Sequence, residues 1–408
     1  MENERVINTL QHRFQRKISI EDNFGCRVDE PYPHVLVSSK KELHGWYYSK
    51  EPLGRRECTA ERLLINPYAG CAHNCFFCYA NAYKGYFERY RKEGIVTVFK
   101  DFDKVIAQQL DSLNIASCGY LSPVTDPFQP INKKYELAEK ITSVFISRNI
   151  PIEFITKGKV PNKIISLIKT QQHSFGQISI LTLDEELRKK LVPNGASTEI
   201  LLKNLANLKN ENIYAVARID PIFPYITDSE ESLKELVNKI KDCGANHVIA
   251  SVLDIPKPIQ QDILKNLDRI VPGITRKYLE LYTERIGYYL HANIAYRKKI
   301  FKFLREFCKA SELTFALCME FELVRRNKKQ YYRGLNQDFA TSINCEGLDV
   351  PIYMRKNDEF QPVNCKGDCL TCNTAACGIE ELKSAKAWKL RDYKRWSKLL
   401  GVKRLEEF

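Results

Sequence analysis

Between residues 60 and 255, segments with the pattern of β-strands alternate with segments that have the pattern of α-helices. The strand patterns occur, in this order, in ERLLINPYAGC, IASCGYLSPVTDP, IPIEFITKG, FGQISILTLD, NIYAVARID and NHVIASVLD. Helical stretches such as STEILLKNLANLKN and DSEESLKELVNKIKDCG lie between the later ones. This alternation is typical of parallel βαβ units, and six of them predict a partial (β/α)6 barrel of the α/β class.

The length of 408 residues exceeds what one barrel of this size needs. We predict an N-terminal extension at residues 1–59, the core barrel at residues 60–256 and a C-terminal region at residues 257–408. The C-terminal region is expected to be α-rich, to carry a cysteine cluster at about residues 345–378, and to end in a basic amphipathic helix. In such barrels functional residues lie at the C-terminal ends of the strands.

Three cysteines follow the first predicted strand at the spacing C-x3-C-x2-C: Cys71, Cys75 and Cys78. Three thiolates on one loop can hold three irons of a four-iron cluster. The fourth iron then stays open to a small molecule that carries an amine and a carboxylate. A structural zinc site would need a fourth ligand, and His73 is too constrained within the loop to complete the tetrahedron easily. Zinc and three unrelated buried cysteines are the alternatives.

The cellular compartment bears on the cysteines, of which the chain has 14. No apolar stretch approaches the roughly 20 residues that span a bilayer. The first residues, MENERVINTLQHRFQRKISIEDN, contain neither a secretion signal nor a lipidation motif. We therefore expect a cytoplasmic protein without a membrane partner. Thiols stay reduced in the cytoplasm, so clustered cysteines indicate metal or cluster ligands.

The segment GCAHNCFFCYA resembles the signature of the radical S-adenosylmethionine (SAM) superfamily. The wider segment NPYAGCAHNCFFCYA resembles the spore-photoproduct-lyase-like branch of that superfamily. Further segments resemble this branch in the same order: SPVTDPFQP (122–130), FITKG (154–158), ISILTLDEELRKKLVPNGAS (178–197) and RIDPIFPYITD (218–228). The resemblance covers about residues 60–255 and implies that the predicted fold is a radical SAM barrel.

The resemblance implies a 4Fe–4S cluster on Cys71, Cys75 and Cys78, with SAM bound at the open iron. Reductive cleavage of SAM then gives methionine and a 5′-deoxyadenosyl radical, which abstracts hydrogen from a substrate. The electron for this cleavage comes from a partner such as a flavodoxin or a ferredoxin. The resemblance thus implies an enzyme with two cofactors, the cluster and SAM.

The resemblance also implies a set of SAM-binding residues: Phe77 at the adenine, Thr125 and Asp126 at the amine, and Ser179, Thr182 and Arg218 at the ribose or the carboxylate. The chemistry agrees, because a carboxylate accepts hydrogen bonds from an ammonium group and an arginine pairs with a carboxylate through two N–H groups. Structural roles are the alternatives: a core position for Phe77, a turn for Asp126 and barrel packing for the last three.

One feature departs from spore photoproduct lyase, which uses a hydrogen-donating cysteine very near the acidic loop after the second strand. Here the residues before Asp126 are LSPVT, and the nearest thiol, Cys118, lies eight positions upstream within the strand. Cys118 fits a small buried core residue better. No hydrogen donor is therefore assigned, and the sequence does not imply repair of the spore photoproduct itself.

A second group of cysteines lies in NCKGDCLTCNTAACG, at the spacing C-x3-C-x2-C-x4-C: Cys365, Cys369, Cys372 and Cys377. This segment has no regular strand or helix pattern, so a bound metal would stabilise its fold. Four thiolates suit either a second iron–sulfur cluster or a zinc ion. We expect a second metal centre here, with a cluster preferred to zinc, and reduced loop thiols are the alternative.

The net charge of +13 favours a polyanionic partner such as nucleic acid, although lysines spread over a solvated surface are the alternative. The tail, IEELKSAKAWKLRDYKRWSKLLGVKRLEEF, is predicted to form an amphipathic helix. Its lysines and arginines would contact phosphates, and its aromatic residues would stack on bases. The apolar positions of this helix are Leu382, Ala385, Trp388, Trp396 and Leu399.

Two classes of function follow. The first is a radical SAM enzyme that acts on nucleic acid, in lesion repair or base modification, and the charge and the branch resemblance favour it. The second is a radical SAM enzyme that modifies a peptide or a small metabolite, with an auxiliary C-terminal cluster, and the additional cysteines favour it. Salt-dependent binding of oligonucleotides discriminates between the two.

Overall fold

The computed structural model describes residues 21–22, 25–30, 32–45, 58, 60–83, 85, 87–326, 329–357, 359–384 and 386–403. At its centre is a seven-stranded sheet with the order β16-β12-β11-β10-β9-β8-β4. The strands are β4 (Arg62–Ile65), β8 (Cys118–Leu121), β9 (Ile152–Thr156), β10 (Phe175–Ser179), β11 (Tyr214–Ile222), β12 (His247–Val252) and β16 (Thr314–Leu317). All neighbours pair in parallel. The sheet therefore has one edge formed by strand C-termini, the carboxyl edge, and an opposite amino edge.

The six strands predicted from the sequence are confirmed as β4, β8, β9, β10, β11 and β12, and so is the α/β barrel fold. The structure adds β16 from the C-terminal region as a seventh strand. This strand pairs with β12 in the register Val248↔Phe315 and Ala250↔Leu317. The strands in the middle of the sheet are buried throughout, as expected where helices cover a parallel sheet.

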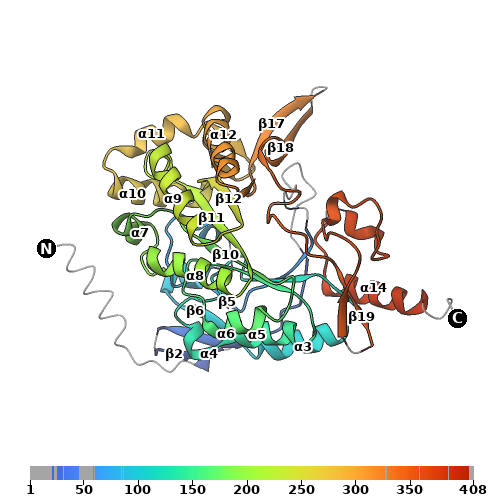
Figure 1. Cartoon of the computed structure of the whole chain (residues 1–408). Coiled ribbons are helices and arrows are strands. Elements are labelled where there is room, and N and C mark those ends of the chain that lie inside the picture. Colours follow the sequence, from blue (N-terminus) through green and yellow to red (C-terminus); the bar gives the residue numbers. More distant parts are fainter. Residues whose placement is uncertain are drawn as a thin grey trace.

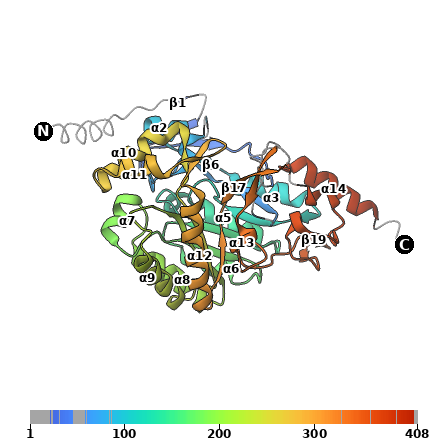
Figure 2. The ribbon, with the colours of Figure 1, turned by 90° about the horizontal axis from the view of Figure 1, so that it is seen from above.

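Helices connect the strands and lie outside the sheet, as Figures 1 and 2 show. Asp184, Ser197 and Ser229 begin α7, α8 and α9, because each side chain accepts hydrogen bonds from N–H groups of the first helical turn. No helix in the described part of the chain is both long and apolar enough to cross a membrane. The helices around the sheet are α3 (Phe102–Asp111), α4 (Asn132–Tyr135), α5 (Leu137–Ile146), α6 (Asn162–Ile168), α7 (Glu185–Leu191), α8 (Thr198–Asn210), α9 (Glu230–Asp242), α10 (Gln260–Ile270), α11 (Ile274–Leu281) and α12 (Ile294–Ala310).

A smaller sheet with the order β1-β2-β3-β6-β5 joins residues before the barrel to those after its first strand. Its strands are β1 (Glu21–Asp22), β2 (Gly25–Val28), β3 (His34–Ser38), β5 (Tyr68–Ala69) and β6 (Val96–Lys100). Between β5 and β6 lie the 3-10 helix η1 (Tyr79–Ala82) and α2 (Glu88–Glu93). Because β5 pairs with β6, this sheet closes the segment that holds the first three cysteines. The remainder of the predicted extension, residues 1–20 and 46–57 among them, lies outside the described residues.

The C-terminal region contains hairpins and loops as well as the expected helices. The strands β19 and β20 form one antiparallel pair, and β17 and β18 form another. The elements are β13 (Ile255–Pro256), η2 (Lys257–Ile259), β14 (Glu284–Ile286), β15 (Tyr289–His291), β17 (Phe321–Arg326), β18 (Lys329–Gly334), α13 (Asn336–Phe339), β19 (Tyr353–Lys356), β20 (Glu359–Pro362), η3 (Cys369–Thr371), η4 (Glu380–Lys383) and α14 (Leu390–Lys403).

The last part of the chain lies at the amino edge of the sheet. Strand β19 pairs with β7 (Ile115–Ala116), which directly precedes β8. The backbone N–H of Asn114 donates to the Ser397 hydroxyl of α14 at 2.7 Å. In Figure 1, β19 and α14 therefore lie on the right, whereas α7, which follows the carboxyl end of β10, lies on the left. The tail and the carboxyl edge face opposite sides of the barrel.

The predicted extent of the tail helix is wrong, because α14 begins only at Leu390. Trp388, just before it, packs edge-to-face on Trp396 with ring centroids 4.9 Å apart, and both side chains are buried. Leu382 lies in η4, Leu399 is 54% exposed, and Ala385 lies outside the described residues. The two tryptophans are core residues of the C-terminal region and are not available to stack on bases.

A buried ionic network joins the C-terminal region to the amino edge of the barrel. Arg62 of β4 lies 2.8 Å from Glu153 of β9 and also contacts Glu346, and none of the three side chains is more than 3% exposed. Beside them, the sulfur atoms of Cys58 and Cys345 are 3.1 Å apart. The network links residues 284 positions apart in the chain, so it holds the loop before β19 against the barrel.

Candidate functional site

The first three cysteines lie on the loop that follows β4 and β5, at the carboxyl edge. Backbone N–H groups of Asn74 and Cys78 donate to the carbonyls of Cys71 and Cys75, both at 3.2 Å. Two successive tight turns thus place the three cysteines at the first or last positions of the turns, and Asn74 between them takes the left-handed conformation (φ 55°). The loop follows the first barrel strand, as the sequence predicts, and the role of its three thiols as cluster ligands stays a prediction.

Two amide side chains hold this cysteine loop from neighbouring barrel loops. Gln129 accepts from the Ala72 N–H at 3.0 Å and donates to the Gly70 carbonyl at 3.2 Å. Asn194 donates to the Ala72 carbonyl at 2.9 Å. Sequence reasoning missed both residues, since an amide that bonds to a distant backbone has no local pattern. They fix the loop on both sides of Cys71.

Asp126 organises the same region from the loop after β8. Its carboxylate accepts from the Thr156 hydroxyl at 2.8 Å, the Phe128 N–H at 2.9 Å and the Lys157 N–H at 2.7 Å. The ring Nδ1 of His73 lies 3.2 Å from it. Burial opposes ionisation, but His73 and the backbone N–H groups outweigh it, so the pKa of Asp126 lies below its usual value. Binding of the SAM amine by Asp126 stays a prediction.

The thiols of the cysteine loop ionise poorly in the protein alone. Burial raises the pKa of Cys75 to about 12, against a smaller opposing effect of the Lys157 cation. Burial also raises the pKa of Cys71 and of Cys78. A bound cation reverses this preference, because a metal ion deprotonates the thiols that coordinate it. The donor set therefore fits a metal cluster.

Orphaned hydroxyl groups lie at the ends of β8 and β10, where the sequence predicts SAM contacts. Within the described part of the chain, Ser122 Oγ, Thr125 Oγ1 and Ser179 Oγ are buried without a hydrogen-bond partner. Buried polar atoms are nearly always paired, so these three fit a polar ligand. Thr182 differs, because its hydroxyl accepts from the Asp184 N–H at 3.1 Å.

The other two predicted contacts have protein partners. Phe77 is buried and packs edge-to-face on Phe223, with ring centroids 5.0 Å apart. Arg218 donates to Gln177 at 2.9 Å and to Asp220 at 2.5 Å. A carboxylate ligand would have to share Arg218 with Asp220. The roles of Phe77 and Arg218 at SAM stay predictions.

Comparison with known proteins bears directly on this loop. Residues 65–249, which include the three cysteines and the ends of β8, β10 and β11, match the family model of the radical SAM superfamily. The chain contains a radical SAM domain. The resemblance in its sequence and the expectation of an enzyme are thereby confirmed.

Two curated relatives are similar in sequence to this chain. A protein of Pseudomonas phage M6, named a radical SAM Nα-GlyT isomerase, is 27% identical over 383 residues, which are 89% of this chain and 78% of that protein. An uncharacterized protein of Mycobacterium bovis is 24% identical over 243 residues, which are 56% of this chain and 69% of that protein. Similarity to the phage protein thus extends well beyond the radical SAM domain.

Among solved structures, spore photoproduct lyase complexed with dinucleoside spore photoproduct has a similar fold. The TM-score is 0.53 at 14% sequence identity, and the match covers 70% of this chain and 82% of that one. Identity this low shows the fold alone. The fold is thus similar to that of spore photoproduct lyase, in agreement with the resemblance in the sequence.

The radical SAM domain carries exposed tyrosines around its carboxyl edge, which we call the tyrosine rim. Tyr79 and Tyr83 extend from the cysteine loop, Tyr225 follows β11, and Tyr288 lies at the tip of the β14–β15 hairpin. Their side chains are 37%, 40%, 45% and 71% exposed, respectively. Tyr79 and Tyr83 pack edge-to-face with ring centroids 5.6 Å apart. Sequence reasoning missed this rim, because its members come from three separate loops.

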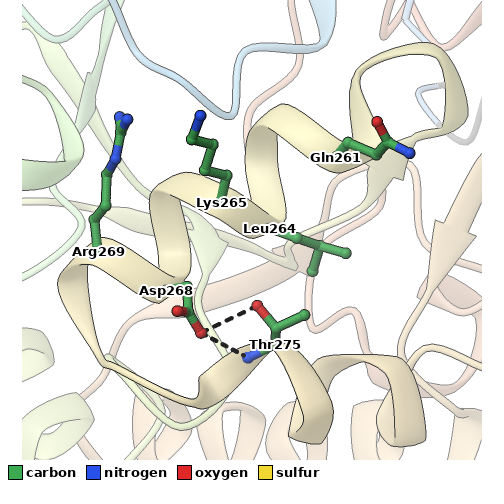
Figure 3. A pocket seen from close by; sticks show the side chains of 6 residues that line it. All are labelled: Gln261, Leu264, Lys265, Asp268, Arg269 and Thr275. Carbon is green, nitrogen blue, oxygen red and sulfur yellow. Dashed lines mark hydrogen bonds between the residues drawn. The ribbon is translucent and has the colours of Figure 1, made fainter.

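A surface pocket between α10 and α11 lies apart from these residues (Figure 3). Asp268 at its base accepts from the Thr275 hydroxyl at 3.1 Å and so holds the turn between the two helices. Lys265 and Arg269 extend from the same side of α10. No predicted site residue lines this pocket, which is a feature of the helix pair and not of the radical site.

Proposed function

We propose that this radical SAM enzyme acts on nucleic acid, in base modification or lesion repair. The observation that carries the proposal is the tyrosine rim around the carboxyl edge, together with the net charge of +13. Exposed aromatic side chains on a protein of net positive charge are typical of proteins that bind unstacked bases. The similar fold of a lyase complexed with a dinucleoside supports this class of substrate.

In such an enzyme the residues of the site would have different roles. Cys71, Cys75 and Cys78 would hold the 4Fe–4S cluster, and the hydroxyls of Thr125 and Ser179 would bind SAM. The bound cofactors supply a 5′-deoxyadenosyl radical that abstracts hydrogen from the substrate. Gln129 keeps the cysteine loop in place through its two backbone hydrogen bonds. The electron donor is a reduced flavodoxin or ferredoxin.

Binding of oligonucleotides tests the proposal. The protein is expected to bind a fluorescent single-stranded oligodeoxynucleotide, with an affinity that falls linearly with salt on logarithmic axes, because phosphate contacts release counterions. Replacing Tyr83, Tyr225 or Tyr288 by alanine should weaken binding about tenfold, since each stacked base contributes about 1–3 kcal/mol. Fluorescence anisotropy at several salt concentrations measures both effects.

The tail provides a matched control. Lys394, Arg395 and Lys398 are exposed on α14 at the amino edge. Their neutralisation should flatten the salt dependence slightly and leave the effect of the tyrosine substitutions unchanged. A protein that ignores DNA and RNA even at low salt would overturn the proposal. Modification of a peptide or a small metabolite would then be the better interpretation.

For the C-terminal cysteine loop we infer a second metal centre. The Ile352 N–H points at Cys365 Sγ at 3.4 Å, and the Ala375 N–H points at Cys372 Sγ at 3.3 Å. Such N–H contacts stabilise metal-bound thiolates, as second-shell partners do in metal sites. The loop has only the short helix η3 as regular structure. The proposed ligands are Cys365, Cys369, Cys372 and Cys377.

At these four cysteines we prefer an iron–sulfur cluster to zinc. Sulfur atoms around a tetrahedral zinc ion lie about 3.8 Å apart, given zinc–sulfur bonds of about 2.3 Å. Among the described residues, the one group of three or more metal-binding atoms within 4.8 Å of one another is Cys58, Cys345 and Glu346. In the described part of the chain no three of the C-terminal thiols are that close, so the loop holds no preformed tetrahedral zinc site.

Metal analysis tests the second centre. Anaerobically reconstituted protein should contain more iron than one four-iron cluster per chain, and a variant without Cys71, Cys75 and Cys78 should keep the excess. The double variant Cys369→Ala and Cys372→Ala should lose the excess and keep the first cluster. Iron and zinc are measured by mass spectrometry. A triple variant that holds neither metal would leave the C-terminal cysteines as reduced loop thiols.

A further inference from the structure

The segment that follows β12 runs from the carboxyl edge to the cysteine loop. Asp254 comes two residues after the end of β12, and β13 directly after it packs on η1, the short helix that follows Cys78. The next turn, η2, packs on η1 as well. Asp254 therefore lies beside the cysteine loop, and it is not among the residues predicted to bind SAM.

Strand register places a histidine opposite Asp254. Strand β13 pairs antiparallel with β15 in the register Ile255↔Leu290 and Pro256↔Tyr289. Asp254 precedes Ile255 and His291 follows Leu290, so the same register sets Asp254 across from His291. Side chains of directly opposed residues lie on one face, and so does that of Tyr289, two positions from His291.

Asp254 and His291 are the members of this region that lack protein partners. Asp220 is paired with Arg218, and Glu320 with Arg297. In the described part of the chain, no other residue donates a hydrogen bond to the Asp254 carboxyl group. His291 is 4% exposed, and its Nδ1 atom has no hydrogen-bond partner there either. The buried Nδ1 atom of His291 indicates a ligand that satisfies it, and the partly exposed carboxyl group of Asp254 is accessible to the same ligand.

The charged and aromatic residues around Asp254 indicate which kind of ligand fits. Burial, and then the nearby charges of Glu320 and Asp220, raise the pKa of Asp254 to about 7. Near neutral pH its carboxyl group can therefore donate as well as accept a hydrogen bond. A phosphate would be repelled by the neighbouring carboxylates. Tyr83 and Tyr289, which are hydrogen-bonded to each other, stand beside this pair.

We propose that Asp254 and His291 bind the hydrogen-bonding edge of a nucleobase, next to Tyr83 and Tyr289. A carboxyl group and a ring nitrogen place a donor beside an acceptor, and the edges of bases present the complementary pattern. Enzymes that act on a base take it out of the stack and read its edge in this way. The proposal rests on the proposed function, and it assigns the residues that read the base.

Two oligonucleotide probes test the site. One is a fluorescent single-stranded nonamer of mixed sequence, and the other is the same backbone with every base replaced by tetrahydrofuran. Reconstituted protein with SAM is expected to prefer the probe with bases. Asp254→Leu and His291→Phe should each reduce that preference about tenfold, since a lost base-edge contact costs about 1–3 kcal/mol. Asp254→Asn should restore part of it, because the amide keeps a donor and an acceptor.

Controls separate this inference from the proposed function. Asp262→Asn removes an exposed carboxylate of α10 and should leave the preference unchanged. Wild-type protein that binds neither probe would overturn the proposed function and this site with it. Equal binding of both probes by the wild type would contradict base stacking on the tyrosine rim as well as this site, whereas a preference that survives Asp254→Leu and His291→Phe would overturn the base-reading site alone. Thermal unfolding of each variant confirms that loss of preference does not reflect loss of fold.

Discussion

Replacing Cys71, Cys75 or Cys78 by alanine is expected to abolish cleavage of SAM to 5′-deoxyadenosine. Each thiol holds one iron, and the protein offers no adjacent substitute in the loop, where His73 is turned towards Asp126. Loss of second-shell partners alone lowers metal affinity about 10–100-fold, so loss of a ligand should cost more than about 100-fold in activity. Anaerobic reconstitution, reduction with dithionite and chromatography of the products measure the effect.

Two further measurements make this prediction specific. The variants should lose the broad visible absorption of the cluster together with activity, while far-ultraviolet circular dichroism stays unchanged. Cys243→Ala is the matched control, because this half-buried thiol follows α9 on the outer layer and should leave both signals intact. Continued SAM cleavage in all three ligand variants would contradict the assignment of the radical site.

The part of the fold that could be predicted is the part governed by local pattern. Each of the six predicted strands is a short apolar run between helical segments, and β4, β8 and β10 lie where the pattern places them. Parallel pairing then brings their C-terminal ends to one edge, so the cysteine loop and Ser179 could be placed near each other without coordinates.

Long-range pairing accounts for what could not be predicted. Strand β16 joins β12 across 61 intervening residues, and its sequence alone does not distinguish it from a strand of a separate hairpin. Trp388 and Trp396 have helical spacing in the sequence. In the structure their side chains pack on each other in the core, and the helix begins only at Leu390, after Trp388. Tertiary packing overrides the local pattern in both places.

In the site, too, the local pattern predicted some residues and long-range contacts determine the others. Cysteine spacing identified the cluster ligands, because three irons require three thiolates close together. The residues that position them, Gln129 and Asn194, act on backbone atoms 59 and 122 positions away. Asp254 is set opposite His291 only by the register of β13 and β15. Contacts of this kind depend on the folded topology, and no local sequence pattern predicts them.

The buried network around Arg62 provides the second large effect. Arg62→Met is expected to lower the free energy of unfolding by about 3–5 kcal/mol, because it leaves the carboxylates of Glu153 and Glu346 buried without their cation. The exposed pair of Arg276 and Glu280 on α11 is the matched control, and Arg276→Met should cost less than about 1 kcal/mol. Urea unfolding followed by tryptophan fluorescence measures both changes.

The pH dependence of this loss follows from the ionisation of Glu153. Burial, and then the charge of Glu346, raise the pKa of Glu153 even with Arg62 in place, and removal of the cation raises it further. A carboxyl group whose pKa is higher in the folded state stabilises the fold below its unfolded pKa, about 4.3, and this stabilisation is lost as the pH rises through the folded pKa. Arg62→Met should therefore be less destabilising at pH 5 than at pH 8. An equal loss at both values would show that the packing of Arg62, and not its charge, holds the C-terminal region on the barrel.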